Sequence, residues 1–226
     1  MAGEIELNKI FLGCNYSNKK VKKHFDGTKL RIEKNWPIHV VLIDREKAKG
    51  AKDLWKEITT AISDCSLAIF DVSGFRPNVI LELGYALATK DVDNILITFD
   101  ERKSRGGKKP EWLLSDIAHL NQIRYKELGA LERKIEEQLD RVPIVARFKA
   151  FMTEAQGVST SHAKYCEIGL KILQMMRDKG TISDQQIISA ARGSAIRVAT
   201  LNTMLKKHKL ATRARGPNGR WKLPLI

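Results

Sequence analysis

The stretch Ser66-Leu-Ala-Ile-Phe-Asp-Val-Ser-Gly-Phe-Arg-Pro-Asn-Val-Ile-Leu-Glu-Leu-Gly-Tyr-Ala86 decides the fold of this chain. Its segment Leu67–Phe70 is an uninterrupted apolar run, which is typical of a strand buried on both faces of a sheet. Residues 73–77 have the composition of a turn. Asn78 is a good N-cap for the apolar helix that is expected from Val79. A buried strand followed by a turn and a helix predicts an α/β sheet.

Two acidic residues stand out in this stretch. Asp71 ends the predicted strand, and Glu82 lies in the first turns of the predicted helix among apolar neighbours. A poorly solvated carboxylate costs free energy, and the positive end of a helix offsets part of that cost. Both side chains are therefore expected near the carboxyl end of a buried strand, where open α/β sheets bind ligands.

The rest of the first 140 residues repeats this alternation. Strands are predicted at residues 9–13, 37–43, 67–70, 94–99 and 119–125, and helices at 21–35, 51–64, 112–116 and 128–139. The pattern predicts a five-stranded parallel flavodoxin-like sheet of order 2-1-3-4-5, whose switch point lies between the first and third strands. The Gly13–Tyr16 loop and the Asp71–Glu82 segment would then face one crevice. His39 is predicted to be a hydrogen-bonded histidine of the strand core.

Composition narrows the class of protein. The chain has 226 residues, 43% of them hydrophobic and 29% charged, as in a globular domain with room for a small second one. No apolar run approaches the roughly 20 residues that cross a membrane, and the first residues lack the features of a signal peptide. The three scattered cysteines are interpreted as reduced thiols rather than metal ligands. A cytoplasmic protein without a metal or a membrane partner is expected.

Charge is concentrated at one end of the chain. Residues 161–226 carry seven Lys and six Arg against three acidic residues, and the net charge of the whole chain is +14. This asymmetry predicts a polyanion-binding module, with a solubilising basic tail as the alternative. We expect an α/β domain over residues 1–142, a linker over 143–161 and a second domain over 162–226.

The second domain resembles a winged-helix domain. Helices are expected at 163–179, at 184–191 with Ser183 as cap, and after Ser194 with Val198, Leu201 and Leu205 pointing inward, followed by a basic hairpin around 216–219. Such domains bind DNA or proteins, and the charge favours nucleic acid. The candidate nucleic-acid-binding residues are Arg197, Thr200, Lys206, Lys207, Arg213, Arg215, Arg220 and Lys222.

Four segments of the first domain carry a second resemblance. Lys9-Ile-Phe-Leu-Gly13, Asp71-Val-Ser73, Pro77-Asn-Val79 and Glu82-Leu-Gly-Tyr-Ala86, in this order, resemble the TIR-like nucleotide-binding proteins of bacteria, which are relatives of TIR domains and of nucleoside 2-deoxyribosyltransferases. The resemblance covers about residues 8–140. It implies cleavage of an N-glycosidic bond of NAD, a nucleoside or a nucleotide, with Glu82 catalytic and with NAD or a nucleotide as substrate rather than cofactor.

The chemistry suits a carboxylate. Breaking a ribosyl C–N bond builds positive charge on the sugar, and a fixed carboxylate stabilises or traps that state. Asp71 is the second candidate catalytic residue, which would hold a ribose hydroxyl or orient Glu82. The candidate substrate-binding residues are Gly13, Cys14, Asn15, Tyr16, Ser73, Asn78 and Phe75, the last as a ring that stacks on a base.

The turn before Glu82 distinguishes between the two protein families that this chain resembles. Deoxyribosyltransferases usually carry an Asp in a Gly-Thr-containing turn before the glutamate, whereas this chain has Phe75-Arg-Pro-Asn78, which favours the TIR-like branch. Ligand binding without catalysis and a structural role for Glu82 remain alternatives.

The two resemblances together suggest a biological role. The domain combination resembles bacterial anti-phage defence effectors, which implies a homo-oligomer and a partner defence protein. The competing hypotheses are a nucleotide-sensing DNA-binding regulator without catalysis, and a nucleoside deoxyribosyltransferase.

Overall fold

A five-stranded parallel sheet forms the centre of the molecule. The structure, a computed structural model, describes residues 6–43, 51–102, 120, 122–158, 161–214 and 219–224. The sheet order is β2-β1-β3-β4-β5, with every neighbouring pair parallel, which confirms the predicted class and strand order. The strands are β1 (Glu6–Gly13), β2 (His39–Val41), β3 (Cys65–Asp71), β4 (Ile95–Asp100) and β5 (Gln122–Tyr125).

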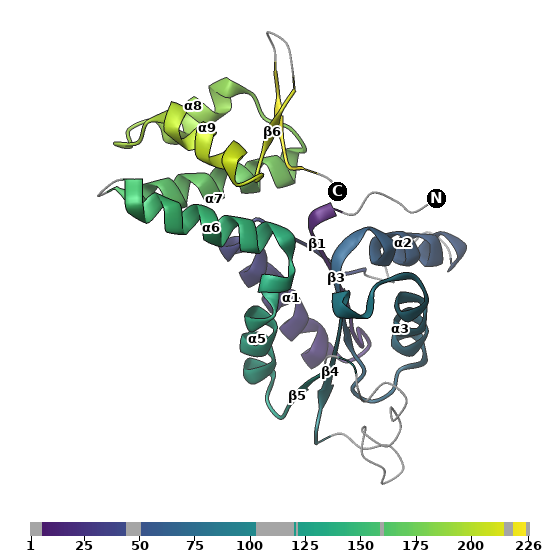
Figure 1. Cartoon of the computed structure of the whole chain (residues 1–226). Helices are drawn as coiled ribbons and strands as arrows, with labels where there is room; N and C mark the ends of the chain where they lie inside the picture. Colours follow the sequence, from purple (N-terminus) through teal and green to yellow (C-terminus); the bar gives the residue numbers. More distant parts are fainter. Residues whose placement is uncertain are drawn as a thin grey trace.

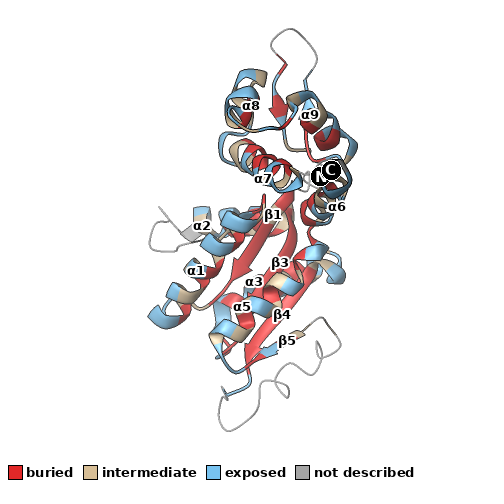
Figure 2. Ribbon diagram, turned by 90° about the vertical axis from the view of Figure 1, so that its left-hand side faces the viewer, coloured by how far each residue is buried: buried red, intermediate tan, exposed pale blue. Residues whose placement is uncertain are grey.

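Helices cover both faces of this sheet (Figure 1). One face packs against α1 (Lys19–Asn35) and α5 (Leu128–Glu137), and the other against α2 (Ala51–Asp64) and α3 (Pro77–Thr89). All seven residues of β3 are buried, and the strands form the buried centre in Figure 2. Successive side chains of a strand point to opposite faces, so Leu67 and Ile69 meet α1 and α5 while Ala68 and Phe70 meet α2 and α3.

The expected linker at residues 143–161 is wrong over most of its length. Residues 143–158 form helix α6 (Pro143–Val158), after the short 3₁₀ turn η4 (Leu139–Arg141). The polar residues near position 153 suggested a linker. However, the apolar residues of this segment recur at helical spacing, and the segment therefore folds as a helix. A side chain on Gly169 of the next helix would meet the Phe151 ring at 2.9 Å, so the two helices pack closely. The buried residues of α6 are Ile144, Val145, Phe148, Phe151 and Ala155.

The last part of the chain forms a small lobe of three helices and a hairpin. It consists of α7 (His162–Lys179), α8 (Asp184–Ala191), α9 (Val198–Lys207) and the antiparallel pair β6 (Thr212–Arg213) and β7 (Trp221–Lys222). Ser183 caps α8 in a capping box with Gln186, as predicted. The third helix begins at Val198 rather than directly after Ser194, with Arg197 at its N-cap. No helix in the described ranges is long and apolar enough to cross a membrane.

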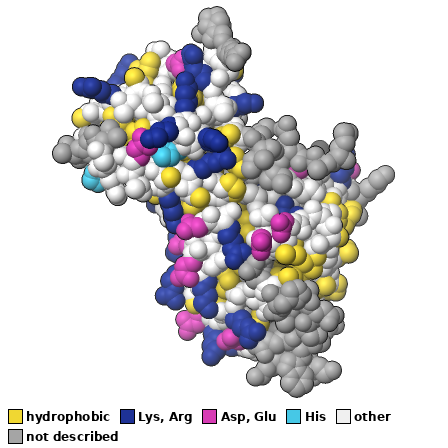
Figure 3. Space-filling view, in the orientation of Figure 1, with side chains coloured by type: hydrophobic (Ala, Val, Ile, Leu, Met, Phe, Trp, Pro, Cys, Tyr) yellow, Lys and Arg dark blue, Asp and Glu magenta, His cyan; other side chains and the backbone are white. Residues whose placement is uncertain are grey.

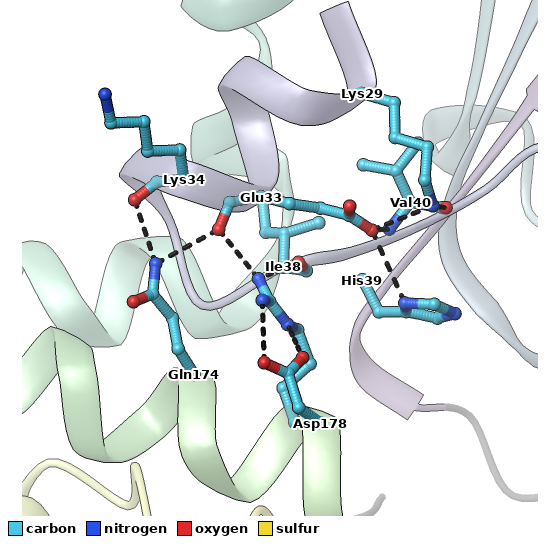
Figure 4. A network of polar contacts seen from close by, with 9 residues as sticks. Lys29, Glu33, Lys34, Ile38, His39, Val40, Gln174 and Asp178 are labelled. Atoms are coloured by element: carbon cyan, nitrogen blue, oxygen red, sulfur yellow. Dashed lines mark hydrogen bonds and ion pairs between the residues drawn. The ribbon is translucent and has the colours of Figure 1, made fainter. Parts of the chain in front are cut away.

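Helix α7 anchors this lobe to the amino end of the sheet. Gln174 donates hydrogen bonds to the carbonyls of Glu33 and Lys34, and Arg177 donates to those of Glu33 and Ile38 at 2.7 and 3.0 Å (Figure 4). The last carbonyls of a helix have no partner within it, so α7 satisfies the end of α1. One buried apolar cluster runs continuously from β1 through α6 and α7 to Trp221.

A half-buried carboxylate, that of Glu33, stabilises the same corner. Glu33 accepts from Lys29 and from the Val40 backbone N–H at 2.9 Å, and contacts the ring of His39 at 3.5 Å (Figure 4). Burial alone would raise the pKa of Glu33, but these hydrogen bonds outweigh it and lower the pKa to about 2. His39 was predicted to be a core residue; this is wrong, because its side chain is 48% exposed on β2.

We expect Glu33→Gln to lower the free energy of unfolding by about 1–3 kcal/mol at neutral pH. The pKa of Glu33 is lower in the folded than in the unfolded state, so its contribution is complete above pH 4.5 and is lost as the pH falls toward about 2. The difference between wild type and variant should therefore shrink over that window in urea unfolding. Glu137→Gln, on an exposed ion pair of α5, is the control; an equal loss in both variants would contradict the expectation.

Candidate active site

The carboxyl ends of β1 and β3 lie side by side, because Gly13 pairs with Phe70. The chain leaves β3 through a tight turn in which Gly74 and Phe75 have φ values of 76° and 51°. A positive φ is unfavourable for a bulky residue, and this turn directs the chain into α3. Helix α3 begins at Pro77 with Arg76 at the N-cap. The predicted N-cap role of Asn78 is therefore wrong, and its side chain is exposed in the first turn.

A small cavity opens at the end of β1. It is narrow, with a volume of about 10 Å³, and it brings together four of the predicted site residues, Gly13, Cys14, Tyr16 and Glu82. Glu82 is buried, with 5% of its surface exposed. The remaining wall is apolar, and sequence reasoning did not find it, because these residues look like ordinary core positions. It consists of Phe11, Leu12, Ile43 and Ile58.

Gly13 makes room for the carboxylate. A Cβ at this position would lie 3.0 Å from Glu82 Oε2 and 2.8 Å from Phe70 Cδ1. Real Cβ atoms essentially never approach that closely, and the Phe70 ring is fully buried and cannot move aside. The backbone of β1 and the side chain of α3 are therefore in direct contact. This contact depends on glycine.

Asp71 occupies the other face of the sheet. It follows Leu67 and Ile69 in the strand alternation, on the face covered by α1 and α5. The Ser73 hydroxyl donates to its Oδ1 at 2.5 Å, the Ser73 N–H at 3.1 Å, and the Tyr125 hydroxyl lies 3.3 Å from both carboxylate oxygens. The Ser73 hydroxyl in turn accepts the N–H of Asp100. The turn after β3 and the ends of β4 and β5 are thus tied to one carboxylate.

Besides burial, the negative charges of Asp71 and Glu82 both raise the pKa of the Cys14 thiol. Burial is the largest cause that raises the pKa of Cys14, followed by the negative charges of Asp71, Glu82 and Asp26. Cys14 therefore stays a neutral thiol. A neutral thiol does not offset the negative charge of the two carboxylates. The negative charge that remains would stabilise a positive charge developing on a bound ligand.

Some predicted site residues lie outside the cavity lining. Asn15 is half-buried and accepts from the Ser17 hydroxyl at 2.7 Å. Phe75 is buried in the turn after β3 and Ser73 belongs to the Asp71 network. Tyr125 was missed by sequence reasoning, since nothing in residues 119–125 distinguishes a buried tyrosine that serves a distant carboxylate.

Replacing Tyr125 tests the Asp71 network. Burial is the main cause that raises the pKa of Tyr125, and the charge of Asp71 adds to it, so the phenol remains a hydrogen-bond donor. Tyr125→Phe should cost about 1–3 kcal/mol of unfolding free energy, because a buried carboxylate loses a donor. Tyr85→Phe is the matched control, since its hydroxyl pairs with Ser63 at a half-buried position and should cost less. Equal losses in thermal or urea unfolding would contradict this expectation.

The candidate nucleic-acid-binding residues lie on the C-terminal lobe (Figure 1), which α7 joins to the amino end of the sheet, whereas this cavity lies at the carboxyl end of β1. Lys207 forms an ion pair with Glu154, and Arg213 donates to Asp184, which also accepts from the Trp221 indole. Arg215 falls outside the described residues. The candidates with exposed side chains are Arg197, Lys206, Lys207, Arg213, Arg220 and Lys222, and Thr200 is half-buried.

The comparisons with known proteins find similarity among solved structures. No family model and no curated protein matches this sequence. Among solved structures, the chain is similar to the CMP N-glycosidase BcmB of Clostridium botulinum, with 20% identity and a TM-score of 0.43; the match covers 57% of this chain and 97% of that chain. A similarity of this extent assigns neither activity nor substrate to this chain.

Proposed function

We propose that this protein is an N-glycosidase that cleaves the bond between ribose and base in a nucleotide, with NAD among the candidate substrates. A single observation supports the proposal. The carboxylate of Glu82 is buried in a cavity at the carboxyl end of β1, in contact range of a glycine that leaves it space. Parallel α/β sheets bind ligands at this edge.

The reaction places positive charge next to that carboxylate. The C1′–N bond breaks with its electron pair on the base, and the sugar becomes an oxocarbenium-like cation that Glu82 stabilises or traps. Water then supplies hydroxide to C1′. Its proton ends on the base where the base leaves as an anion, and in solvent where nicotinamide leaves as a neutral molecule. The apolar wall of Phe11, Ile43 and Ile58 strengthens the attraction, since charges interact more strongly away from water. Asp71, on the other face of the sheet and held by Ser73 and Tyr125, would act indirectly, by fixing the turn that leads into α3 and so orienting Glu82.

The test is direct. Purified full-length protein is incubated with NAD and with ribonucleotides and deoxyribonucleotides of each base, with and without DNA, and released base is measured by chromatography. Release of free base supports the glycosidase. Base exchange between deoxynucleosides would support a deoxyribosyltransferase, and tight binding without turnover under every condition would support a nucleotide-sensing regulator.

We further propose that the C-terminal lobe is a winged-helix module that binds nucleic acid. Its order of three helices and a hairpin supports this, together with the backbone bridge between Ile182 and Trp221 that joins the start of α8 to β7. Lys and Arg side chains lie across the visible face of the lobe (Figure 3). Positively charged surfaces of this kind bind phosphates.

Salt dependence distinguishes this function from protein binding. We expect Arg197→Ala, at the exposed N-cap of α9, to weaken duplex DNA binding and to reduce the slope of log K against log salt by about 1. Fluorescence anisotropy at several salt concentrations measures both. Lys164→Ala, a lysine paired with Glu167 on α7, should leave the slope unchanged. Binding without salt dependence would contradict the proposal.

We also propose a defence role and self-association. An anti-phage effector predicts that cells carrying the wild type, but not Glu82→Gln, resist phage and lose the substrate on infection. Self-association is supported by large apolar side chains exposed on α2 and α3, where Leu81 is 58% and Trp55 38% exposed. Leu81→Glu should then give a monomer by light scattering.

A further inference from the structure

We propose that Tyr16 gates the cavity that holds Glu82. The structure is the closed form of this cavity, and a ligand reaches the carboxylate only after the Tyr16 ring moves aside. The inference rests on the proposed glycosidase function for the identity of the ligand, and it adds a conformational step that precedes cleavage of the bond between sugar and base.

The cavity is too small for a substrate in this form. Its volume of about 10 Å³ is room for one water molecule at most, whereas sites for small molecules measure about 300–1,000 Å³. The side chain of Glu82 is buried, with 5% of its surface exposed. One wall of the cavity must therefore move before a sugar can meet this carboxylate.

The residues that line the cavity differ in burial. Tyr16 and Ile43 are partly exposed, so they lie at the mouth of the cavity, between it and solvent. The other lining residues are buried, and close packing in the core keeps them in place. These buried residues are Phe11, Leu12, Gly13, Cys14, Ile58 and Glu82.

The contact with Lys22 indicates that Tyr16 is the part that moves. The ammonium of Lys22 lies over the Tyr16 ring, 5.6 Å from the ring centroid. Lysine side chains keep the ammonium group toward water, so the ring has the cavity on one side and a solvent-directed charge on the other. The attraction between this cation and the face of the ring stabilises the closed form.

The segment that carries Tyr16 is anchored at both ends. Gly13 pairs with Phe70 of β3, and Asn18 caps α1 by accepting from two backbone N–H groups of its first turn. Between these anchors, residues 14–17 form neither a helix nor a strand, and the hydrogen bond from the Asn18 N–H to the Asn15 carbonyl is long, at 3.3 Å. This segment can change its conformation while β1 and α1 stay in place.

The three cysteines of the chain allow the opening to be measured. Cys14 lines the cavity, Cys65 is fully buried in β3 outside the cavity lining, and Cys166 on α7 is half-buried. Thiolates rather than thiols react with iodoacetamide, and burial together with nearby carboxylates raises the pKa of the Cys14 thiol in the closed form. Opening of the cavity therefore makes Cys14 reactive without Cys65, whereas global unfolding makes both reactive.

The experiment labels the full-length protein with iodoacetamide under native conditions and follows each cysteine by mass spectrometry of its peptides. Tyr16→Ala should raise the labelling rate of Cys14 about tenfold or more and leave that of Cys65 unchanged, because the side chain that closes the cavity is removed. Tyr16→Phe keeps the ring and should label Cys14 at nearly the wild-type rate. Lys22→Gln, which removes the charge over the ring, should raise the rate at Cys14 by a smaller factor.

Ile43→Ala is the matched control, since Ile43 lies at the same mouth. A larger increase at Cys14 for Ile43→Ala than for Tyr16→Ala, or equal increases for Tyr16→Phe and Tyr16→Ala, would overturn the inference. If Tyr16→Ala also exposes Cys65, that variant unfolds and Lys22→Gln decides: an increase at Cys14 alone supports the gate, and no increase overturns it. None of these measurements requires turnover, so the gate can fail while the glycosidase stands, and the gate can be confirmed even if no nucleotide is cleaved.

Discussion

Replacing Glu82 with glutamine is expected to lower kcat for base release by about a thousandfold or more, because the group that stabilises the developing charge on the sugar is removed. Glutamine has nearly the same shape, so the cavity at the end of β1 should keep its walls. The KM should change little, since the loss falls on the transition state rather than on ground-state binding. Steady-state kinetics on the substrate found in the panel assay measures both constants.

The control for this variant is Glu137→Gln. Glu137 lies on the exposed side of α5, 61% exposed and paired with Arg133, and its replacement should leave kcat unchanged. If the Glu82→Gln protein turns over at the wild-type rate, Glu82 has a structural role only. That result would contradict the glycosidase proposal, which depends on Glu82 as the catalytic group.

Replacing Gly13 with alanine is expected to have the second largest effect. The new Cβ would lie 2.8 Å from the Phe70 ring and 3.0 Å from Glu82 Oε2. Since the ring is fixed in the core, the carboxylate or the strand must shift. A displaced catalytic group costs about a hundredfold in rate per ångström, and the crowded core should lose about 1–3 kcal/mol of unfolding free energy. Activity assays and urea unfolding measure the two effects.

Gly27→Ala is the matched control. Gly27 lies inside α1, and a Cβ there would meet nothing within 4 Å. Alanine has the higher helix propensity, so this variant should be as stable as the wild type or more stable by about 0.5–1 kcal/mol. If Gly13→Ala behaves in the same way and keeps its activity, Glu82 is not held against β1 as the structure indicates.

The fold could be predicted because its determinants are local. The unbroken apolar run at Leu67–Phe70 and the alternation of strands with helices predicted the sheet and its order. The boundaries of α2 and α8 also agree with the prediction. The linker prediction failed because it relied on the polar residues near position 153. The apolar residues of α6 stabilise a helix only when they pack against α7, and this contact cannot be recognised from the segment alone.

The site could be predicted only in part. Gly13, Cys14, Tyr16 and Glu82 meet in one cavity because parallel strands bring their carboxyl ends to one edge. Ile43 and Ile58 join them from elements whose contact with this edge has no local signature. Asn78 was expected to cap α3, but Pro77 already starts the helix and leaves its side chain in solvent.

The sequence by itself determined the strand order, the glycine at the end of β1 and the acidic residue in the helix after β3, since each depends on the chemistry of a few adjacent residues. Only the tertiary structure decided which side chains meet: Glu82 against Gly13, Tyr125 at Asp71, and Arg177 at the end of α1. These contacts join residues far apart in the chain. Their geometry exists only once packing has placed the elements beside one another.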